Sequence, residues 1–214
     1  MRLGIFGGTF DPVHLGHLLL AETARDECEL DRVVFVPAGI PPNKLNRSFS
    51  AGEHRYEMLC RTVEPYANLE VSRFEIDHPE ISYTVRTVRH FQALYPDATL
   101  FLIVGSETLA DIPRWHETRQ LCQLVSIIVA WRAGMPEPDF APFSSLVSSH
   151  ILTQWKSQVI PMPKIELSAT EIRRRVAAGK SIRFRVSNAV EEYIEQNDLY
   201  RVALDSLGCN IENG

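Results

Sequence analysis

Cysteine is scarce in this sequence, and the few cysteines lie far apart. The 214 residues include Cys28, Cys60, Cys122 and Cys209, and no two of them form a C-x-x-C pair. Such sparse cysteine argues against a disulfide framework or a zinc knuckle, and it suits a reducing compartment. A chain of this length can bury a full core without such cross-links.

Long apolar runs are missing as well. No stretch approaches the roughly 20 apolar residues that a membrane-spanning helix needs. The N-terminal residues Met1 to Phe6 run at once into Gly7, Gly8 and Asp11, which is too short for the apolar core of a signal peptide. We therefore expect a cytoplasmic protein with no membrane partner.

The chain has no excess of basic residues either. Its 22 Lys and Arg face 27 Asp and Glu, for a formal net charge of −5. No basic field points to nucleic acid, so we expect no such partner, and an anionic ligand would need a local basic patch. The composition is that of a soluble globule. Length and pattern predict one domain over residues 1–201 and a frayed tail over 202–214.

Short β-rich runs alternate with helical patterns along the chain. Strands are predicted at Arg2–Phe6, Arg32–Val36, Leu69–Phe74, Thr99–Val104 and Val125–Val129, with a weaker one near Val159–Glu166. Helices are predicted at Leu15–Cys28, Ala51–Val63, Thr84–Leu94, Ser168–Ala178 and Asn188–Gln196, and the proline-rich stretch after Trp131 is expected to be loop. This alternation predicts an α/β fold, an open parallel sheet with helices on both faces and a small C-terminal helical portion.

The segment 168–185 begins like a helix and is strongly basic. Ser168-x-x-Glu171 fits a capping box, as does Ser50-x-x-Glu53, and Gly179 is placed to end the helix. The segment forms a local positive patch in an acidic protein. A solvated basic face is the alternative, which we favour for two of its members, Arg174 and Lys180. The six basic residues are Arg173, Arg174, Arg175, Lys180, Arg183 and Arg185.

The most informative stretch joins the first predicted strand to the first predicted helix. The pair Gly7-Gly8 lets a ligand approach the backbone at the carboxyl end of a strand, where open α/β sheets bind ligands. His14 and His17 are three residues apart, so they face the same side of the first helical turn, with Gly16 between them. A helix N-terminus attracts anions. Together these features predict phosphoryl or nucleotidyl chemistry.

Other interpretations of this stretch are weaker. A glycine pair after a strand can be structural, and a histidine at a helix start can be a cap. The phosphate-loop signatures G-x-G-x-x-G and G-x-x-x-x-G-K-[ST] are absent here. Catalytic zinc takes three protein ligands, and Asp11 is the one further candidate nearby. The other five histidines, His116 among them, have no motif around them and are interpreted as structural or surface residues.

Residues 4–17, G-I-F-G-G-T-F-D-P-V-H-L-G-H, resemble the signature of the HxGH nucleotidyltransferases, relatives of the class I aminoacyl-tRNA synthetases with a Rossmann-like fold. Within that superfamily the chain is most similar to the bacterial nicotinate-nucleotide adenylyltransferases, as far as about Arg201. Asn43, Glu107 and Asp111 depart from the family pattern. The other segments that carry the resemblance are Pro41–Lys44, Ser82–Thr84, Gly105–Glu107, Pro113–Trp115, Ser168–Arg173 and Val190–Tyr200.

The resemblance implies adenylyl transfer from ATP to nicotinate mononucleotide, with release of pyrophosphate, in NAD biosynthesis. It implies Mg²⁺ held mainly by the ATP phosphates and no metal site made by the protein alone. The catalytic residues it implies are His14, His17, Arg173 and Lys44. The ATP-binding residues it implies are Gly7, Gly8, Thr9, Phe10, His14, His17, Gly105, Glu107, Ser168, Thr170 and Arg173. The residues it implies for the acceptor are Thr84, Trp115, Lys44 and Arg132.

Two alternatives remain open at this point. An enzyme of the same fold could use nicotinamide mononucleotide or another phosphorylated acceptor such as phosphopantetheine, although the S-Y-T and P-x-W segments disfavour the latter. A nucleotide-sensing or RNA-binding module could keep the fold without activity, against which the intact His14, His17 and Arg173 argue. The sequence leaves the oligomeric state open, and a homo-oligomer is compatible with it.

Overall fold

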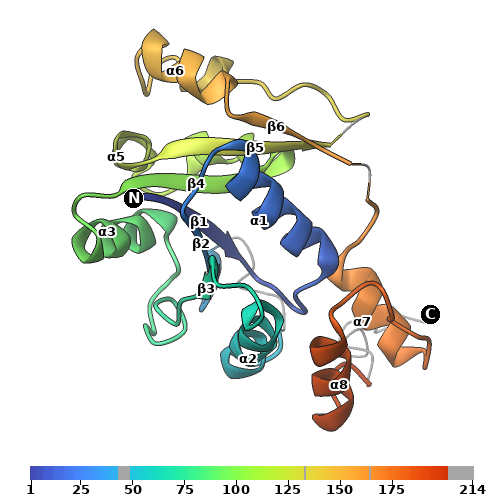
Figure 1. Ribbon diagram of the computed structural model, residues 1–214. Helices are drawn as coiled ribbons and strands as arrows, with labels where there is room; N and C mark the ends of the chain where they lie inside the picture. Colours follow the sequence, from blue (N-terminus) through green and yellow to red (C-terminus); the bar gives the residue numbers. More distant parts are fainter. Residues whose placement is uncertain (43–48, 133, 164, 202–214) are drawn as a thin grey trace, which may run out of the picture.

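The computed structural model describes residues 1–42, 49–132, 134–163 and 165–201. In these ranges a six-stranded parallel sheet has the order β3-β2-β1-β4-β5-β6 (Figure 1). The chain starts at the centre of the sheet, builds outward to β3, and then crosses to the other side of β1. The strand order therefore reverses between β1 and β4. The strands are β1 (Arg2–Gly8), β2 (Arg32–Pro37), β3 (Leu69–Val71), β4 (Thr99–Gly105), β5 (Ser126–Arg132) and β6 (Val159–Met162).

Helices cover both faces of the sheet, as strands buried on both sides require. On one face α1 and α2 pack through residues such as Ala21 and Met58. α7 and α8 lie beyond the sheet and extend the same core, with α8 packed on α2 (Figure 1). On the other face α3, α5 and α6 pack through Val88 and Trp155, among others. The helices are α1 (Leu15–Glu27), α2 (Gly52–Val63), α3 (Thr84–Leu94), α4 (Ser106–Leu109), α5 (Thr118–Leu124), α6 (Ser149–Lys156), α7 (Ala169–Ala177) and α8 (Asn188–Gln196), with short 3₁₀ turns at Ile112–Arg114 and Ala141–Phe143.

The predicted α/β fold is confirmed, with two strands shorter than expected. β3 ends at Val71 rather than Phe74, because the chain then turns and the backbone N–H groups of Ile76 and Asp77 both donate to the carbonyl of Arg73. β6 ends at Met162 rather than Glu166. The predicted helices are present, and three shorter ones, α4, α5 and α6, were not predicted.

One of the two predicted capping boxes is wrong. The N-cap of α2 is Ala51, while the N–H of Ser50 donates to Asp11 Oδ2 at 3.2 Å and Glu53 pairs with Arg73 at 2.6 Å. Ser50 therefore binds a residue of the loop after β1 and does not cap α2.

The cap of α7 is confirmed in part. Ser168 Oγ accepts from the N–H of Glu171 at 3.1 Å, whereas the Glu171 carboxylate pairs with Arg174. Gly179 follows the helix with φ +64°, a conformation that glycine adopts readily. The predicted tail, 202–214, lies outside the described residues, so the domain boundary at residue 201 stays a prediction.

Candidate active site

Two openings adjoin the carboxyl ends of the central strands, where the strand order reverses and where open α/β sheets bind ligands. The larger, here called the α3 cavity, has a volume of about 360 Å³ and is lined by Gly7, Gly8, Tyr83, Thr84, Trp115 and others. The smaller, here called the α1 cleft, has a volume of about 30 Å³ and is lined by Gly16, Glu107, Arg132 and Leu167, among others. Gly105, at the end of β4, lines both.

His14 and His17 form one unit at the start of α1. His14 is the N-cap, and its backbone N–H donates to His17 Nδ1 at 3.2 Å. The two rings stack, with centroids 3.6 Å apart and planes 18° from parallel. A Cβ at Gly16 would lie 3.1 Å from His14 Nδ1, which is tighter than ordinary contact. The H-x-G-H spacing is thus a packing requirement, because the His14 ring lies against the glycine.

Both imidazoles are neutral at physiological pH. Burial lowers the pKa of His14 to about 4, and the nearby charge of Arg132 adds to the effect. Burial also holds the pKa of His17 well below its usual range, with contributions from His14 and Arg132. Neutral imidazole carries one N–H donor and one acceptor. Within the described ranges His14 Nδ1 is a buried polar atom without a hydrogen-bond partner, a feature that calls for a ligand or a water molecule.

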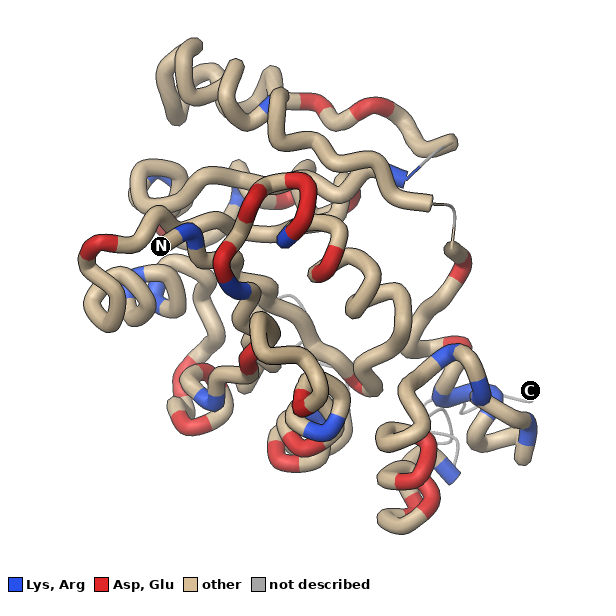
Figure 2. Tube along the Cα trace, viewed as in Figure 1, with Lys and Arg blue, Asp and Glu red and all other residues tan. Residues whose placement is uncertain are grey.

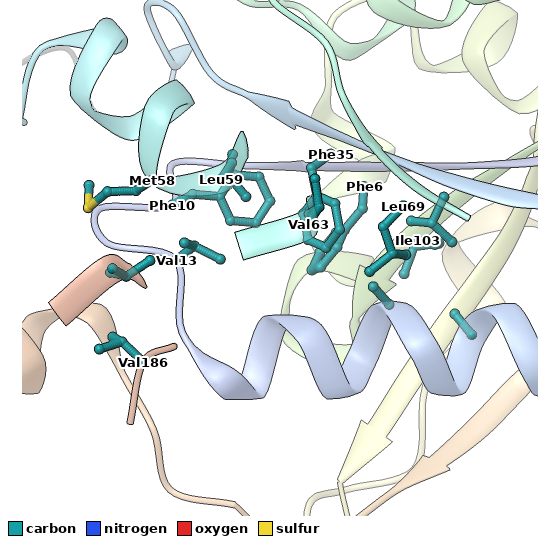
Figure 3. Packing of buried hydrophobic residues seen from close by; sticks show 14 of the residues in the cluster. Phe6, Phe10, Val13, Phe35, Met58, Leu59, Val63, Leu69, Ile103 and Val186 are labelled. Carbon is teal, nitrogen blue, oxygen red and sulfur yellow. The ribbon is translucent and has the colours of Figure 1, made fainter. Parts of the chain in front are cut away.

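The Phe10 ring packs edge-on against the His17 ring. Its side chain is 2% exposed and belongs to the core, where its ring centroid lies 5.0 Å from that of His17 and 5.4 Å from that of Phe6. Figure 3 shows Phe10 and Val13 packed with Met58 of α2. The sequence predicted Phe10 as an ATP contact. Because its side chain is buried, only its backbone atoms could make such a contact.

Arg173 ties α7 to the loop after β1. Its Nη1 donates to the backbone carbonyl of Asp11 at 2.7 Å, and its Nη2 lies 3.4 Å from Thr170 Oγ1. The Asp11 side chain is 1% exposed and accepts from the hydroxyl of Tyr200 at 2.6 Å. Burial, together with the charge of Asp11, raises the pKa of Tyr200. Two segments that are distant in sequence, α7 and the residues after α8, therefore hold this loop in place.

The basic residues predicted as a patch over 168–185 make different contacts. Figure 2 shows its Lys and Arg residues around α7. Arg173 reaches the loop after β1, whereas Arg174 is exposed and pairs with Glu171. Arg175 Nε donates to the carbonyl of Ser181 at 2.8 Å. The structure thus separates Arg173 from its basic neighbours.

The α3 cavity combines a helix end with aromatic rings. α3 begins at Thr84, and the first N–H groups of a helix have no partner within it. Trp115 lines the same cavity. Tyr83 and His116 stack beside it, with centroids 4.2 Å apart. His116, interpreted from sequence as structural or surface, therefore belongs to this wall, and its position directly after Trp115 was the one signal for it.

Three further predicted site residues, Arg132, Glu107 and Thr9, line one or the other of the two openings. Arg132 lines the α1 cleft with Glu107 and does not line the α3 cavity with Thr84 and Trp115, the group in which it was predicted. Thr9 lines the α3 cavity together with the glycine pair. Lys44 lies outside the described residues.

Neither a metal cluster nor a membrane span was found in the part of the chain that the structure describes. No three His, Cys, Asp or Glu side chains there are grouped to hold a metal ion. None of the helices in those ranges has the length and apolar character of a transmembrane segment.

Comparison with known proteins places this geometry in a family. The cytidylyltransferase-like family model matches residues 5–175. A protein from Thermomicrobium roseum named "probable nicotinate-nucleotide adenylyltransferase" is 40% identical over 200 residues, which cover 94% of this chain and 92% of the relative. A protein of the same name from Thermus thermophilus is 41% identical over 203 residues, covering 94% of this chain and all of the relative.

Solved structures agree with the fold. Plasmodium falciparum nicotinic acid mononucleotide adenylyltransferase, complexed with NaAD, superposes with a TM-score of 0.74 at 19% identity, over 95% of this chain and 99% of that one. Fold and site together define a nucleotidyltransferase of the cytidylyltransferase-like class. Within that class the chain belongs to the nicotinate-nucleotide adenylyltransferase family.

Proposed function

We propose that this chain transfers the adenylyl group of ATP to nicotinate mononucleotide, producing deamido-NAD and pyrophosphate. In this proposal ATP lies over the start of α1 and the mouth of the α1 cleft, and the mononucleotide lies in the α3 cavity. The observation that carries the proposal is the junction of the two openings at Gly105. One opening adjoins a pair of neutral histidines and contains Arg132, and the other presents an aromatic ring and a helix N-terminus. The relatives named above support the same reaction.

The reaction depends more on how the substrates are positioned and how their phosphate charge is stabilised than on proton transfer. A phosphate oxygen of the mononucleotide attacks the α-phosphorus of ATP, and the bond from that phosphorus to the bridging oxygen breaks. The bonding electron pair leaves with pyrophosphate. Because the nucleophile is already an anion, no strong general base is required, and preorganised donors carry the catalysis.

The proposed donors are two histidines and two arginines, which would stabilise the negative charge on the phosphates. His14 and His17 can each donate one N–H to phosphate oxygens, and their low pKa values keep them neutral while they do so. Arg173 and Arg132 supply positive charge to the leaving phosphates. Mg²⁺ would enter with ATP, bound mainly by its phosphate oxygens, since magnesium keeps several waters and is commonly held by substrate phosphates.

The acceptor groups suit a pyridine carboxylate. The N–H groups in the first turn of α3, at Thr84, stabilise a negative charge through hydrogen bonds and the helix dipole. The indole of Trp115 offers a face for the pyridine ring. The substrates are soluble nucleotides, which together with the sparse cysteine supports a cytoplasmic enzyme.

Pyrophosphate release from Mg-ATP with a panel of acceptors tests this proposal. The panel contains nicotinate mononucleotide, nicotinamide mononucleotide, phosphopantetheine and no acceptor. We expect release with nicotinate mononucleotide, and mass spectrometry should detect deamido-NAD in equal amount. Release with phosphopantetheine alone would replace the proposed acceptor, and no release with any acceptor would contradict adenylyl transfer altogether.

A further inference from the structure

A buried carboxylate, Glu75, lines the α3 cavity and has no part in the reaction described above. It lies in the segment between β3 and α3 and is 9% exposed. The hydroxyl of Thr87, one turn into α3 from Thr84, donates to Glu75 Oε1 at 2.5 Å. A buried carboxylate that keeps its charge needs such donors, and a helix that donates one is held in place by it.

The backbone around Glu75 is fixed with equal closeness. A Cβ at Gly39, in the loop after β2, would lie 2.0 Å from the carbonyl oxygen of Glu75, so no larger residue fits there. Ser82 Oγ accepts from the N–H groups of Gly39 and Ile40 at 3.0 and 3.1 Å, and the N–H of Ser82 donates back to the Ile40 carbonyl at 2.9 Å. The loop after β2 and the residues just before α3 therefore form one unit.

Hydrogen-bond donors and a positive charge surround the Glu75 carboxyl group, although burial has the largest effect on its pKa. Burial raises the pKa of Glu75, and hydrogen bonds from Thr87 and Ser82 and the positive charge of Arg55 on α2 oppose this rise. Arg55 is itself 3% exposed, and its Nη1 donates to the carbonyl of Thr9 at 2.9 Å. The carboxylate thus joins α3, α2 and two loops at the floor of the α3 cavity.

We infer that Glu75 is a positioning residue for the acceptor, which holds the first turn of α3 through Thr87 so that the amide groups at Thr84 are aimed at the pyridine carboxylate. The inference rests on the proposed function, because it assigns the acceptor to the α3 cavity. Glu75 and Thr87 line that cavity and do not line the α1 cleft. Loss of the contact between Glu75 and Thr87 should therefore weaken the binding of the mononucleotide and leave the binding of ATP unchanged.

A pair of variants at Thr87 separates the hydroxyl from the volume it occupies. Thr87→Val removes the donor and keeps the branched shape, whereas Thr87→Ser keeps the donor. Losing one donor to a buried charge should raise the KM for nicotinate mononucleotide by roughly tenfold in Thr87→Val. We expect the KM for ATP to stay within about twofold, and Thr87→Ser to restore the wild-type KM for the mononucleotide.

Glu75→Gln provides a second test from the other side of the contact. It keeps an acceptor oxygen and removes the charge, and it should raise the mononucleotide KM in the same selective way. Thermal unfolding of each variant reports whether the fold is retained.

Equal changes in both KM values, unchanged KM values, or failure of Thr87→Ser to restore binding would overturn the inference. Unfolding of both Thr87→Val and Glu75→Gln would do so as well, since it would assign the contact to stability alone. Wild-type turnover with nicotinate mononucleotide is measured first, so that a failure of the proposed function is recognised separately.

Discussion

The α1 cleft and the α3 cavity are built in different ways. Beside the α1 cleft, two stacked imidazoles come from a single turn of helix, supported by arginines from β5 and α7. The α3 cavity is assembled from many separate stretches. They are the end of β1, the loop after β2, the segment with Glu75, the start of α3, the end of β4 and the turn that carries Trp115. The difference suggests a division of labour. Under the proposed function, the cleft presents donors and charge to the phosphates of ATP, and the cavity presents an aromatic face and a helix end to the acceptor.

Removing a donor at the α1 cleft should have the largest effect. His17→Ala deletes one preorganised N–H, and the loss of such a donor lowers turnover by about 10²-fold or more. The His17 ring meets Phe6 of β1 and Phe10 edge-on, so thermal unfolding is measured beside turnover to show that the variant keeps its fold. His150→Ala on α6, an exposed histidine, serves as the control and should leave turnover within about twofold. Near-normal turnover in folded His17→Ala would remove the histidine pair from the reaction.

Acidification should destabilise the α1 cleft in particular. His14 has an ordinary pKa of 6.5 when unfolded and about 4 when folded, so the unfolded chain binds more protons between these values. The contribution of His14 to stability is therefore complete above pH 6.5 and is lost as the pH falls toward 4. Between pH 6.5 and pH 5 we expect a loss of about 2 kcal/mol in the free energy of unfolding from this group.

Urea unfolding at a series of pH values measures this loss. His14→Gln lacks the titrating ring and should show a flatter dependence on pH than the wild type. Identical slopes in the two proteins would mean that His14 is not held neutral by the fold.

The guanidinium of Arg173 should matter more than its charge. Arg173→Lys keeps the positive charge but loses the planar fork that now holds the Asp11 carbonyl, and kcat/KM for ATP should fall by roughly tenfold. Arg174→Ala, at an exposed neighbour paired with Glu171, should change it by less than about twofold. Equal effects at the two positions would show that the basic patch acts as a diffuse surface.

The smallest effect is expected at Trp115. An aromatic face stacks on either pyridine ring. Trp115→Ala should therefore lower kcat/KM for nicotinate and nicotinamide mononucleotides alike, by roughly threefold to tenfold. The KM for ATP is the internal control and should not move. A selective loss of one mononucleotide would assign the choice between acid and amide to the indole.

The same contrast explains how much the sequence could predict. The histidine pair was predicted because three-residue spacing on a helix fixes a common face, and that relation is local. The contact between Arg173 and Asp11 spans 162 residues, and its partner is a backbone carbonyl that no side-chain pattern reveals. Arg132 lines the α1 cleft rather than the cavity of Thr84 and Trp115, and this could not be foreseen because its place depends on where the end of β5 lies beside β4.

The fold was predicted more completely than the site. Continuous apolar runs identified the buried strands, and alternation with helices determined that they are parallel. The errors fall where local contacts compete. Ser50 has the spacing of a cap yet donates to Asp11, and the short helices α4 and α5 have too few residues to show a helical period. His116 was missed because its partner in the stack, Tyr83, comes from another segment.

The division between the two openings is tested most directly by the choice between acid and amide. At saturating Mg-ATP, kcat/KM is compared for nicotinate and nicotinamide mononucleotides. The N–H groups at the start of α3 stabilise a carboxylate, whereas the NH₂ of an amide faces them donor to donor, and an unpaired buried polar group costs roughly 1–3 kcal/mol. We predict a preference for the acid of about tenfold or more. Equal values, or a preference for the amide, would contradict the account and remove Thr84 from the site.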